Sequence, residues 1–427
     1  MKRTRLFLLI AILAICGTTG FTSCSSNKEN VNELSNITKI ADQVWTFSQS
    51  HPDGFTLDVR TMTEPTEGIS VSYAATQGSH SRDQLDKVVR HALEHDGYVG
   101  GWYNSNDGLY YFDSSRVFPE DSLRSALRFG KDNLQYSAFI LSTFTDIPIE
   151  GKVAEIVERG NICFGTTGDY RPLSFLEPST GEYWGFGIEM AQSIADYLDV
   201  KVDFAPTSWP TLTADVMAEP QKFDLAIGGI TITDARREIM DMSEGYLGNG
   251  KTILCRTEDA TRFQSLADID KPEVRVMVNP GGLNEKFANE NLTHATIIVH
   301  PKNEEIPSLV AEGQADIMIT EITEAPYYVQ TDSRLAAPLL NSPFTHGEIG
   351  VLMQKGQEDL LQMVNNLIEK KKADGSLRQL HEKYGLVYSY LNFSAYATKT
   401  VLRNLSFHLS LVDGEGDPET TFEGLYP

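Results

Sequence analysis

The chain has 427 residues, a formal net charge of −23 at pH 7 and a sequence pI of about 4.8. This length is enough for two or three domains with cores of their own. The negative charge argues against nucleic acid and anionic membrane surfaces as partners, because both would repel the chain as a whole. A small anionic ligand would need a local positive site.

The first segment predicts export. Lys2, Arg3 and Arg5 precede an apolar run over residues 6–16, which is short for a span across a bilayer. The run Phe21-Thr22-Ser23-Cys24 resembles a bacterial lipoprotein cleavage box, with Phe in place of the usual Leu. We therefore expect residues 1–23 to be a signal peptide and Cys24 to carry a lipid that anchors the exported chain at the periplasmic or outer-membrane face. A plain secretory signal cut nearby is the alternative.

After the cleavage site, residues 24–37 are expected to form a soluble tether. Beyond Cys24 only Cys163 and Cys255 remain, so no metal-binding cysteine spacing is present. The spacing does not decide whether these two cysteines form a disulfide, and two buried thiols are the favoured interpretation.

Residues 38–150 predict a small α+β module whose role the sequence does not define. Strand-like pieces at Gly68–Ala74 and Gly108–Asp113 surround a helix at Gln84–His95, and a second helix is expected at Glu120–Leu141. Turn residues such as Asp53-Gly54 separate these pieces. The tail, residues 386–427, is aromatic early and acidic late, and has no predicted role.

From about residue 157, strands and helices alternate, which predicts parallel sheets covered by helices. Two such sets indicate two lobes, with the extended stretch Lys251–Arg256 between them at a hinge. In sheets of this kind ligands sit beyond the carboxyl ends of the strands. The expected strands are 162–167, 200–204, 223–229, 274–278, 296–299 and 315–320, and the expected helices are 186–198, 212–217, 284–291, 306–312, 358–372 and 376–384.

One turn in the second set predicts an anion site. Pro280-Gly281-Gly282-Leu283 follows a strand and opens a helix, so backbone N–H groups and the positive end of the helix dipole point into the space above the turn. Arg236 follows another glycine-containing segment and could grip a carboxylate with two parallel N–H···O bonds. An ordinary structural turn and a solvated arginine are the simpler alternatives.

Residues 156–385 resemble a type 2 periplasmic solute-binding domain of the polar amino-acid kind, solute-binding family 3. Within that superfamily they are most similar to cyclohexadienyl dehydratases, which convert prephenate to phenylpyruvate and arogenate to phenylalanine. The resemblance implies an α/β fold of two lobes, lobe 1 with residues 156–252 and 347–385 and lobe 2 with residues 257–342. The matching runs include Thr166–Tyr170, Pro206–Pro210, Gly250–Thr252, Val278–Gly282, Asn284–Ala288 and Val299–Pro301.

The resemblance also implies roles for single residues. Arg236 would bind the ligand carboxylate and Thr231 would donate its hydroxyl group to the same site. Trp209 would cover the substrate ring. Leu283 is a departure, because the dehydratase pattern has threonine at that position. The remaining residues implied to bind substrate are Gly229, Asp169, Tyr170, Asn279 and Gly282.

Two glutamates that follow the last strand of lobe 2 would carry the chemistry. Glu321 matches the acid that accepts the α-ammonium group in amino-acid-binding relatives. Glu324 matches the general acid of the dehydratase, which must be protonated near neutral pH, so that its pKa has to be raised by burial or by another carboxylate. Two glutamates that merely complement a helix dipole are the alternative.

The sequence thus favours a decarboxylating dehydratase for a small carboxylate substrate, with no metal or organic cofactor and with the membrane contacted only through the lipid. The alternative is an extracytoplasmic amino-acid-binding protein that serves an ABC transporter permease. Leu283 and Gly187, where the dehydratase usually carries aspartate, support that alternative.

Overall fold

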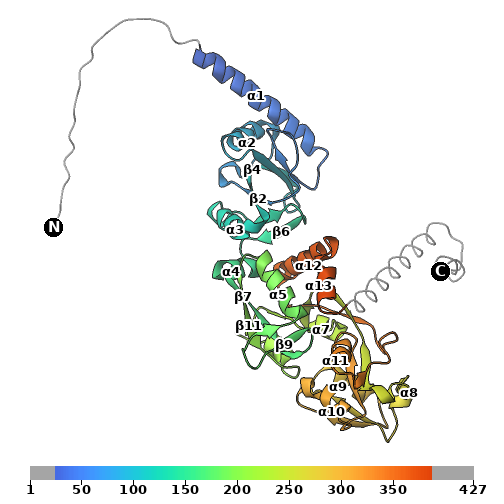
Figure 1. Ribbon diagram of the computed structural model, residues 1–427. Coiled ribbons are helices and arrows are strands. Elements are labelled where there is room, and N and C mark those ends of the chain that lie inside the picture. The colour runs from blue at the N-terminus through green and yellow to red at the C-terminus, as the bar shows by residue number, and fades with distance from the viewer. Residues whose placement is uncertain (1–24, 387–427) are drawn as a thin grey trace, which may run out of the picture. The chain divides into compact units, whose positions relative to one another are not determined.

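The computed structural model describes residues 25–386 (Figure 1). The predicted signal peptide, the predicted lipid attachment site at Cys24 and nearly all of the tail therefore lie outside the described residues. The described residues divide into two compact units, one with residues 25–65 and 72–117, the other with residues 66–71 and 118–386. Among the described residues no helix combines the length and the apolarity that crossing a membrane requires.

The first unit consists of helices α1 (Ser25–Ser48) and α2 (Arg82–Glu94) with the antiparallel strands β1 (Phe55–Asp58), β3 (Tyr98–Asn104) and β4 (Leu109–Phe118). A short 3-10 turn, η1, covers Ala74–Thr76. Helix α1 begins inside the stretch that was expected to be a tether. Ile37, Ala41 and Val44 explain the difference, because their spacing places them on one buried helical face.

In the second unit, β2 (Ile69–Ser72), β5 (Ser137–Ile140) and β6 (Thr145–Pro148) pair antiparallel. The helix expected at Glu120–Leu141 is wrong in its second half. After the turn η2 (Glu120–Ser122), α3 (Leu123–Asp132) ends before Leu134, whose φ of 55° is left-handed. The chain then continues as β5, in which buried and partly exposed side chains alternate as a strand requires.

Lobe 1 is built around a five-stranded sheet that helices cover, with its core at Phe164, Phe186 and Ile194. In spatial order the strands are β11 (Lys201–Pro206), β7 (Asn161–Thr166), β12 (Leu225–Ala226), β21 (Leu352–Gln354) and β13 (Met240–Met242). The helices are α4 (Lys152–Arg159), α5 (Phe186–Tyr197), α6 (Leu212–Val216), α7 (Asp234–Ile239), α12 (Glu358–Ala373) and α13 (Ser376–Lys383), and a small sheet joins β8 (Asp169–Tyr170), β9 (Ser174–Leu176) and β10 (Tyr183–Trp184).

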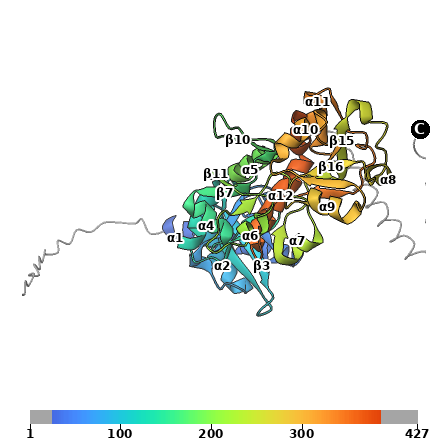
Figure 2. The ribbon, with the colours of Figure 1, turned by 90° about the horizontal axis from the view of Figure 1, so that it is seen from below.

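Lobe 2 has a second five-stranded sheet, and Figure 2 shows α9, α10 and α11 gathered around it. Its strands in spatial order are β17 (Thr296–Val299), β16 (Arg275–Val278), β18 (Ile317–Glu321), β15 (Lys251–Arg256) and β19 (Leu335–Ala336). Its helices are α8 (Leu266–Ile269), α9 (Leu283–Asn291), α10 (Ile306–Ala311) and α11 (Ala325–Thr331), with 3-10 turns η3 (Thr257–Asp259) and η4 (Asn303–Glu305).

The predicted two-lobed α/β fold is confirmed, but the sheets are mixed rather than parallel. Strands β11, β7 and β12 run parallel, as do β17, β16 and β18, whereas β21 and β15 run antiparallel to their neighbours. Residues 251–256 were expected at the hinge and instead belong to the lobe 2 sheet. The connection between the lobes is the two-stranded ladder of β14 (Leu247–Asn249) and β20 (Gly347–Ile349).

Candidate functional site

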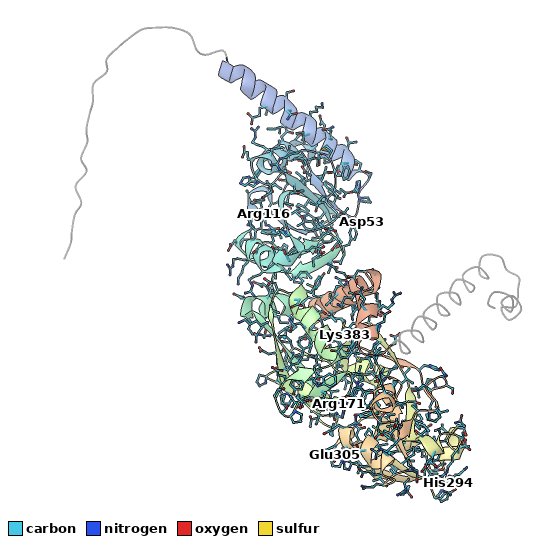
Figure 3. All side chains as sticks on the ribbon, in the orientation of Figure 1. Asp53, Arg116, Arg171, His294, Glu305 and Lys383 are labelled. Atoms are coloured by element: carbon cyan, nitrogen blue, oxygen red, sulfur yellow. The ribbon has the colours of Figure 1, made fainter. Side chains whose placement is uncertain are left out.

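A cavity with an empty volume of about 340 Å³ lies between the two lobes. Figure 3 marks Arg171 in lobe 1 and Glu305 in lobe 2. Most of the predicted substrate-binding residues line this cavity, so residues from eight separate segments come together. Lobe 1 contributes Tyr170, Trp209, Gly229, Thr231 and Arg236, and lobe 2 contributes Lys251, Asn279, Gly282, Leu283, Asn284, Asn303 and Glu321.

Arg236 provides positive charge to the cavity. It lies in the short helix α7, whose cap is Thr233, and its Nη1 donates to the carbonyl oxygen of Thr231 at 2.6 Å. In the described part of the chain no carboxylate forms an ion pair with Arg236. Burial lowers the pKa of Arg236 to about 10, so the guanidinium stays protonated at neutral pH. A buried guanidinium without an ion-pair partner can bind the carboxylate of a ligand.

The predicted glycine turn forms the opposite wall. Gly281 has a φ of 73°, and a Cβ atom there would lie 2.7 Å from Pro210 of lobe 1. The turn therefore needs glycine both for its backbone conformation and for the approach of the other lobe. The N–H group of Gly281 donates to Glu285 Oε2 at 2.6 Å, so it is already occupied. Helix α9 starts at Leu283, and this first turn lines the cavity.

Lys251 is a cavity residue that the sequence interpretation missed. Its Nζ donates to Glu321 Oε1 and to Asn284 Oδ1, both at 2.6 Å, and all three residues are buried. Lys251 and Glu321 face each other in the antiparallel β15–β18 ladder. Burial lowers the pKa of Lys251 to about 7 and raises that of Glu321. The run Gly250–Thr252 was the available signal, but it was assigned to the hinge.

Glu324 is fully buried and lies behind the cavity wall. Thr320 Oγ1 donates to its Oε2 at 2.6 Å, and Asn303 Nδ2 donates to its Oε1 at 2.7 Å. Burial raises the pKa of Glu324 to about 8, and the charge of Asp169 adds to this effect. The carboxyl group is thus protonated at neutral pH. Asn303 lines the cavity and is hydrogen-bonded to Glu324, which is not among the lining residues.

Aromatic side chains form the wall of lobe 1. The rings of Tyr170 and Trp209 meet edge to face, with centroids 5.7 Å apart. Trp209 Nε1 donates to Asp169 Oδ1 at 3.1 Å, so Asp169 orients the indole and does not itself line the cavity. Burial raises the pKa of Asp169. Asp215 fixes the turn around Trp209, because it accepts from the hydroxyl group of Thr207 at 2.7 Å.

Residues 162–387, just over half of the chain, match the bacterial extracellular solute-binding proteins, family 3. The chain belongs to this family. A cyclohexadienyl dehydratase from Pseudomonas aeruginosa is 37% identical over 235 residues, which cover 55% of this chain and 86% of the relative. The L-cystine-binding protein TcyJ of Escherichia coli K12 is 28% identical over 236 residues, with the same two shares covered.

Among solved structures, this family 3 protein is similar to an ancestral amino acid-binding protein, AncCDT-1, described as a precursor of cyclohexadienyl dehydratase. The two have a TM-score of 0.51 and 36% identity, over 55% of this chain and 99% of that structure. Enzymes and non-enzymatic binding proteins thus share the family. Membership therefore establishes an extracytoplasmic solute-binding scaffold, and whether a reaction takes place has to be argued from the residues of the site.

The lobes of this family 3 protein contact each other around the cavity. Asn303 Nδ2 donates to the carbonyl oxygen of Asp169 at 3.2 Å, and Tyr170 Oη lies 3.4 Å from Thr323 Oγ1. Thr231 Oγ1, the predicted ligand donor, donates to Glu321 Oε1 at 3.5 Å. The cleft between the two lobes is therefore closed, and a bound ligand would replace the hydrogen bond from Thr231 to Glu321.

Proposed function

We propose that this protein is a decarboxylating dehydratase that converts prephenate to phenylpyruvate, arogenate to phenylalanine, or both. The observation that carries the proposal is the fully buried carboxyl group of Glu324, hydrogen-bonded to the cavity residue Asn303 in a site whose other wall holds Arg236. A solute-binding site needs a charged group for its ligand but has no use for an acid kept neutral at pH 7. Dehydration needs such an acid, because hydroxide is a poor leaving group.

The residues of the cavity supply the parts that this reaction requires. Arg236 and the Gly282 turn anchor the side-chain carboxylate, and Trp209 packs on the cyclohexadiene ring. Glu324 gives its proton to the C4 hydroxyl group, and the C–O bond breaks to release water. The bond from the ring to its carboxylate breaks at the same stage. Its electron pair enters the ring, which becomes aromatic as CO₂ leaves.

The position of Asn303 determines how Glu324 acts. Since Glu324 does not line the cavity and is hydrogen-bonded to Asn303, which does, we propose that Glu324 reaches the substrate hydroxyl group after the Asn303 side chain moves aside. A well-placed general acid contributes roughly 10²–10⁴-fold to the rate. Closure of the lobes provides the rest by orienting the substrate and excluding water.

Binding of an amino acid for a permease is the second candidate. Glu321 favours it, because this residue occupies the position of an ammonium-binding acid and lines the cavity. On this alternative Glu324 would only support the wall, and its protonation would have no function. The two candidates differ in what happens to prephenate, which is destroyed in one case and unaffected in the other.

The deciding experiment incubates the purified protein with prephenate and follows phenylpyruvate by its ultraviolet absorbance in alkali. We expect turnover by the wild type and a loss of at least about 100-fold in Glu324→Gln, consistent with the usual contribution of a general acid. Glu290→Gln, an exposed change on helix α9 of the same lobe, is the matched control and should keep full activity. Unchanged prephenate together with tight binding of an amino acid would establish the binding protein instead.

We also propose that the exported protein is anchored through a lipid on Cys24. The cleavage-box pattern Phe21–Cys24 and the extracytoplasmic family support this proposal. Cells fed labelled palmitate should label the wild type and Cys16→Ser, and should fail to label Cys24→Ser. Label that persists in Cys24→Ser would contradict the anchor.

A further inference from the structure

We infer that Lys251 determines substrate class: by occupying the Glu321 carboxylate, it keeps out an α-ammonium group, so that the cavity selects 2-oxo acids over α-amino acids. This inference rests on the proposed function and deepens it. Prephenate carries a 2-oxo group where arogenate carries an ammonium group, and the inference therefore names prephenate as the preferred substrate.

The contacts of Lys251 leave Glu321 little capacity for another cation. Lys251 Nζ lies 2.6 Å from Glu321 Oε1, and the side chains of the two residues are only 8% and 7% exposed. Thr231 donates to the same oxygen from the other lobe. The acid that would accept an α-ammonium group is therefore already hydrogen-bonded to an ammonium group of the protein itself.

The pair carries no net charge in either arrangement of its proton. If the proton is on Nζ, a cation faces an anion, and if it is on the carboxyl group, both partners are neutral. An incoming ammonium group would gain attraction from Glu321 only after the pair lost that proton. Amino-acid binding should therefore release protons, whereas binding of a 2-oxo acid should not.

Other charged groups near the pair strengthen this selection. Arg236 of lobe 1 acts electrostatically on Lys251 and brings a second positive charge to the cavity. Glu324, which acts on both members of the pair, is held protonated by its burial. The remaining groups next to the pair, Asn284 and Asn279, are uncharged amides. No free carboxylate among the described cavity residues is left to balance a ligand ammonium group.

A 2-oxo group suits the same surroundings. Its oxygen only accepts hydrogen bonds, and lysine offers three donors and no acceptor. When the proton is on Nζ, two of the three donors of Lys251 are used by Glu321 and Asn284, which leaves one for the ligand. An ammonium group in the same place would point its own N–H donors at those of Lys251, and the two groups could not form a hydrogen bond.

The experiment compares L-phenylalanine with phenylpyruvate by calorimetry, because these molecules share the ring and the carboxylate and differ in the α-substituent. We expect the wild type to bind phenylpyruvate roughly 10–100-fold more tightly, the range expected for one mispaired buried polar group. In Lys251→Met this preference should shrink or invert, through a gain in phenylalanine affinity. Lys286→Met, an exposed change on helix α9, should leave the ratio unchanged.

Calorimetry of the wild type in buffers of different ionisation enthalpy measures how many protons each ligand releases on binding. This measurement tests the inference even if Lys251→Met does not fold. Phenylalanine binding should release up to one proton and phenylpyruvate binding none. Equal affinity for the two ligands, equal proton release, or a folded Lys251→Met with the wild-type ratio would each overturn the inference.

The outcome can be separated from that of the proposed function. A protein that prefers phenylpyruvate but leaves prephenate unchanged would retain the selection by Lys251 and lose the enzymatic role. A protein that converts arogenate and binds phenylalanine as well as phenylpyruvate would retain the enzymatic role and lose the selection.

Discussion

Asn303 is hydrogen-bonded to Glu324: its Nδ2 donates to the glutamate Oε1 at 2.7 Å. The same amide nitrogen donates across the cleft to the carbonyl oxygen of Asp169. One side chain thus contacts both the buried acid and the opposite lobe. The protonation state of Glu324 and the closure of the lobes are consequently linked through Asn303.

Replacement of Asn303 by alanine tests this link. The amide donates to the carboxyl group and so lowers the pKa of Glu324, which means that Asn303→Ala should raise that pKa further. We expect kcat to fall about tenfold or more, because Asn303 holds the acid in position until the Asn303 side chain moves aside for the proton transfer. The decline in activity on the alkaline side of the pH profile should therefore begin at a higher pH. A lower kcat with an unmoved alkaline decline would show that Asn303 acts only on lobe closure.

The wild-type pH profile gives a second prediction. Glu324 has a pKa of about 8 and donates its proton in the proposed reaction, so the active form is present below this pH. We expect kcat/KM to fall about tenfold for each pH unit well above 8. Circular dichroism at each pH should confirm that the fold persists. A rate that rises through pH 8 would exclude Glu324 as the acid.

Stability should follow the same titration. The pKa of Glu324 is raised from an ordinary 4.5 to about 8, so the protonated form is favoured in the folded state. The contribution of Glu324 to the free energy of unfolding is fully present below pH 4.5 and is lost as the pH rises through 8. The free energy of unfolding falls by at most about 1.4 kcal/mol per pH unit for this group. Urea unfolding at pH 5 and pH 9 should show a smaller loss in Glu324→Gln than in wild type. The control Glu290→Gln should behave like wild type.

The sequence predicted most of the elements around the cavity because their patterns are local. The strand at 161–166 and the helices at 186–197 and 283–291 agree closely with expectation, since apolar spacing and the glycine turn mark them. The expected strand at 223–229 is confirmed only at Leu225 and Ala226. Arg236 and the Gly282 turn do meet across one cavity, as the family resemblance implied.

Two features depended on pairing that a single sequence does not reveal. Lys251 reaches the cavity because β15 runs antiparallel to β18 in a register that sets it opposite Glu321. The segment's extended character was correctly predicted, but no local signal gives the partner strand or the register. Glu324 was expected to face the substrate. Its place outside the cavity lining depends on how the start of α11 contacts Asn303 of η4, which is a tertiary contact.

Gly281 and Gly313 provide a matched pair for the last prediction. Both lie in lobe 2 with left-handed φ angles, 73° and 77°, so alanine would strain the backbone similarly at either site. They differ in what a Cβ atom would meet. At Gly281 it would lie 2.7 Å from Pro210 of lobe 1, whereas at Gly313 its nearest neighbour would be the Arg256 side chain at 3.9 Å.

Gly281→Ala should therefore impair closure of the lobes beyond its effect on stability. We expect the two alanine variants to be destabilised by similar amounts, about 1 kcal/mol each, and only Gly281→Ala to lose activity or ligand affinity, by at least about tenfold. Small-angle scattering of the whole protein, with and without ligand, measures the closure. A ligand-induced compaction in Gly313→Ala that is missing in Gly281→Ala would confirm the contact with Pro210. Equal compaction in both variants would show that the turn yields without opening the cleft.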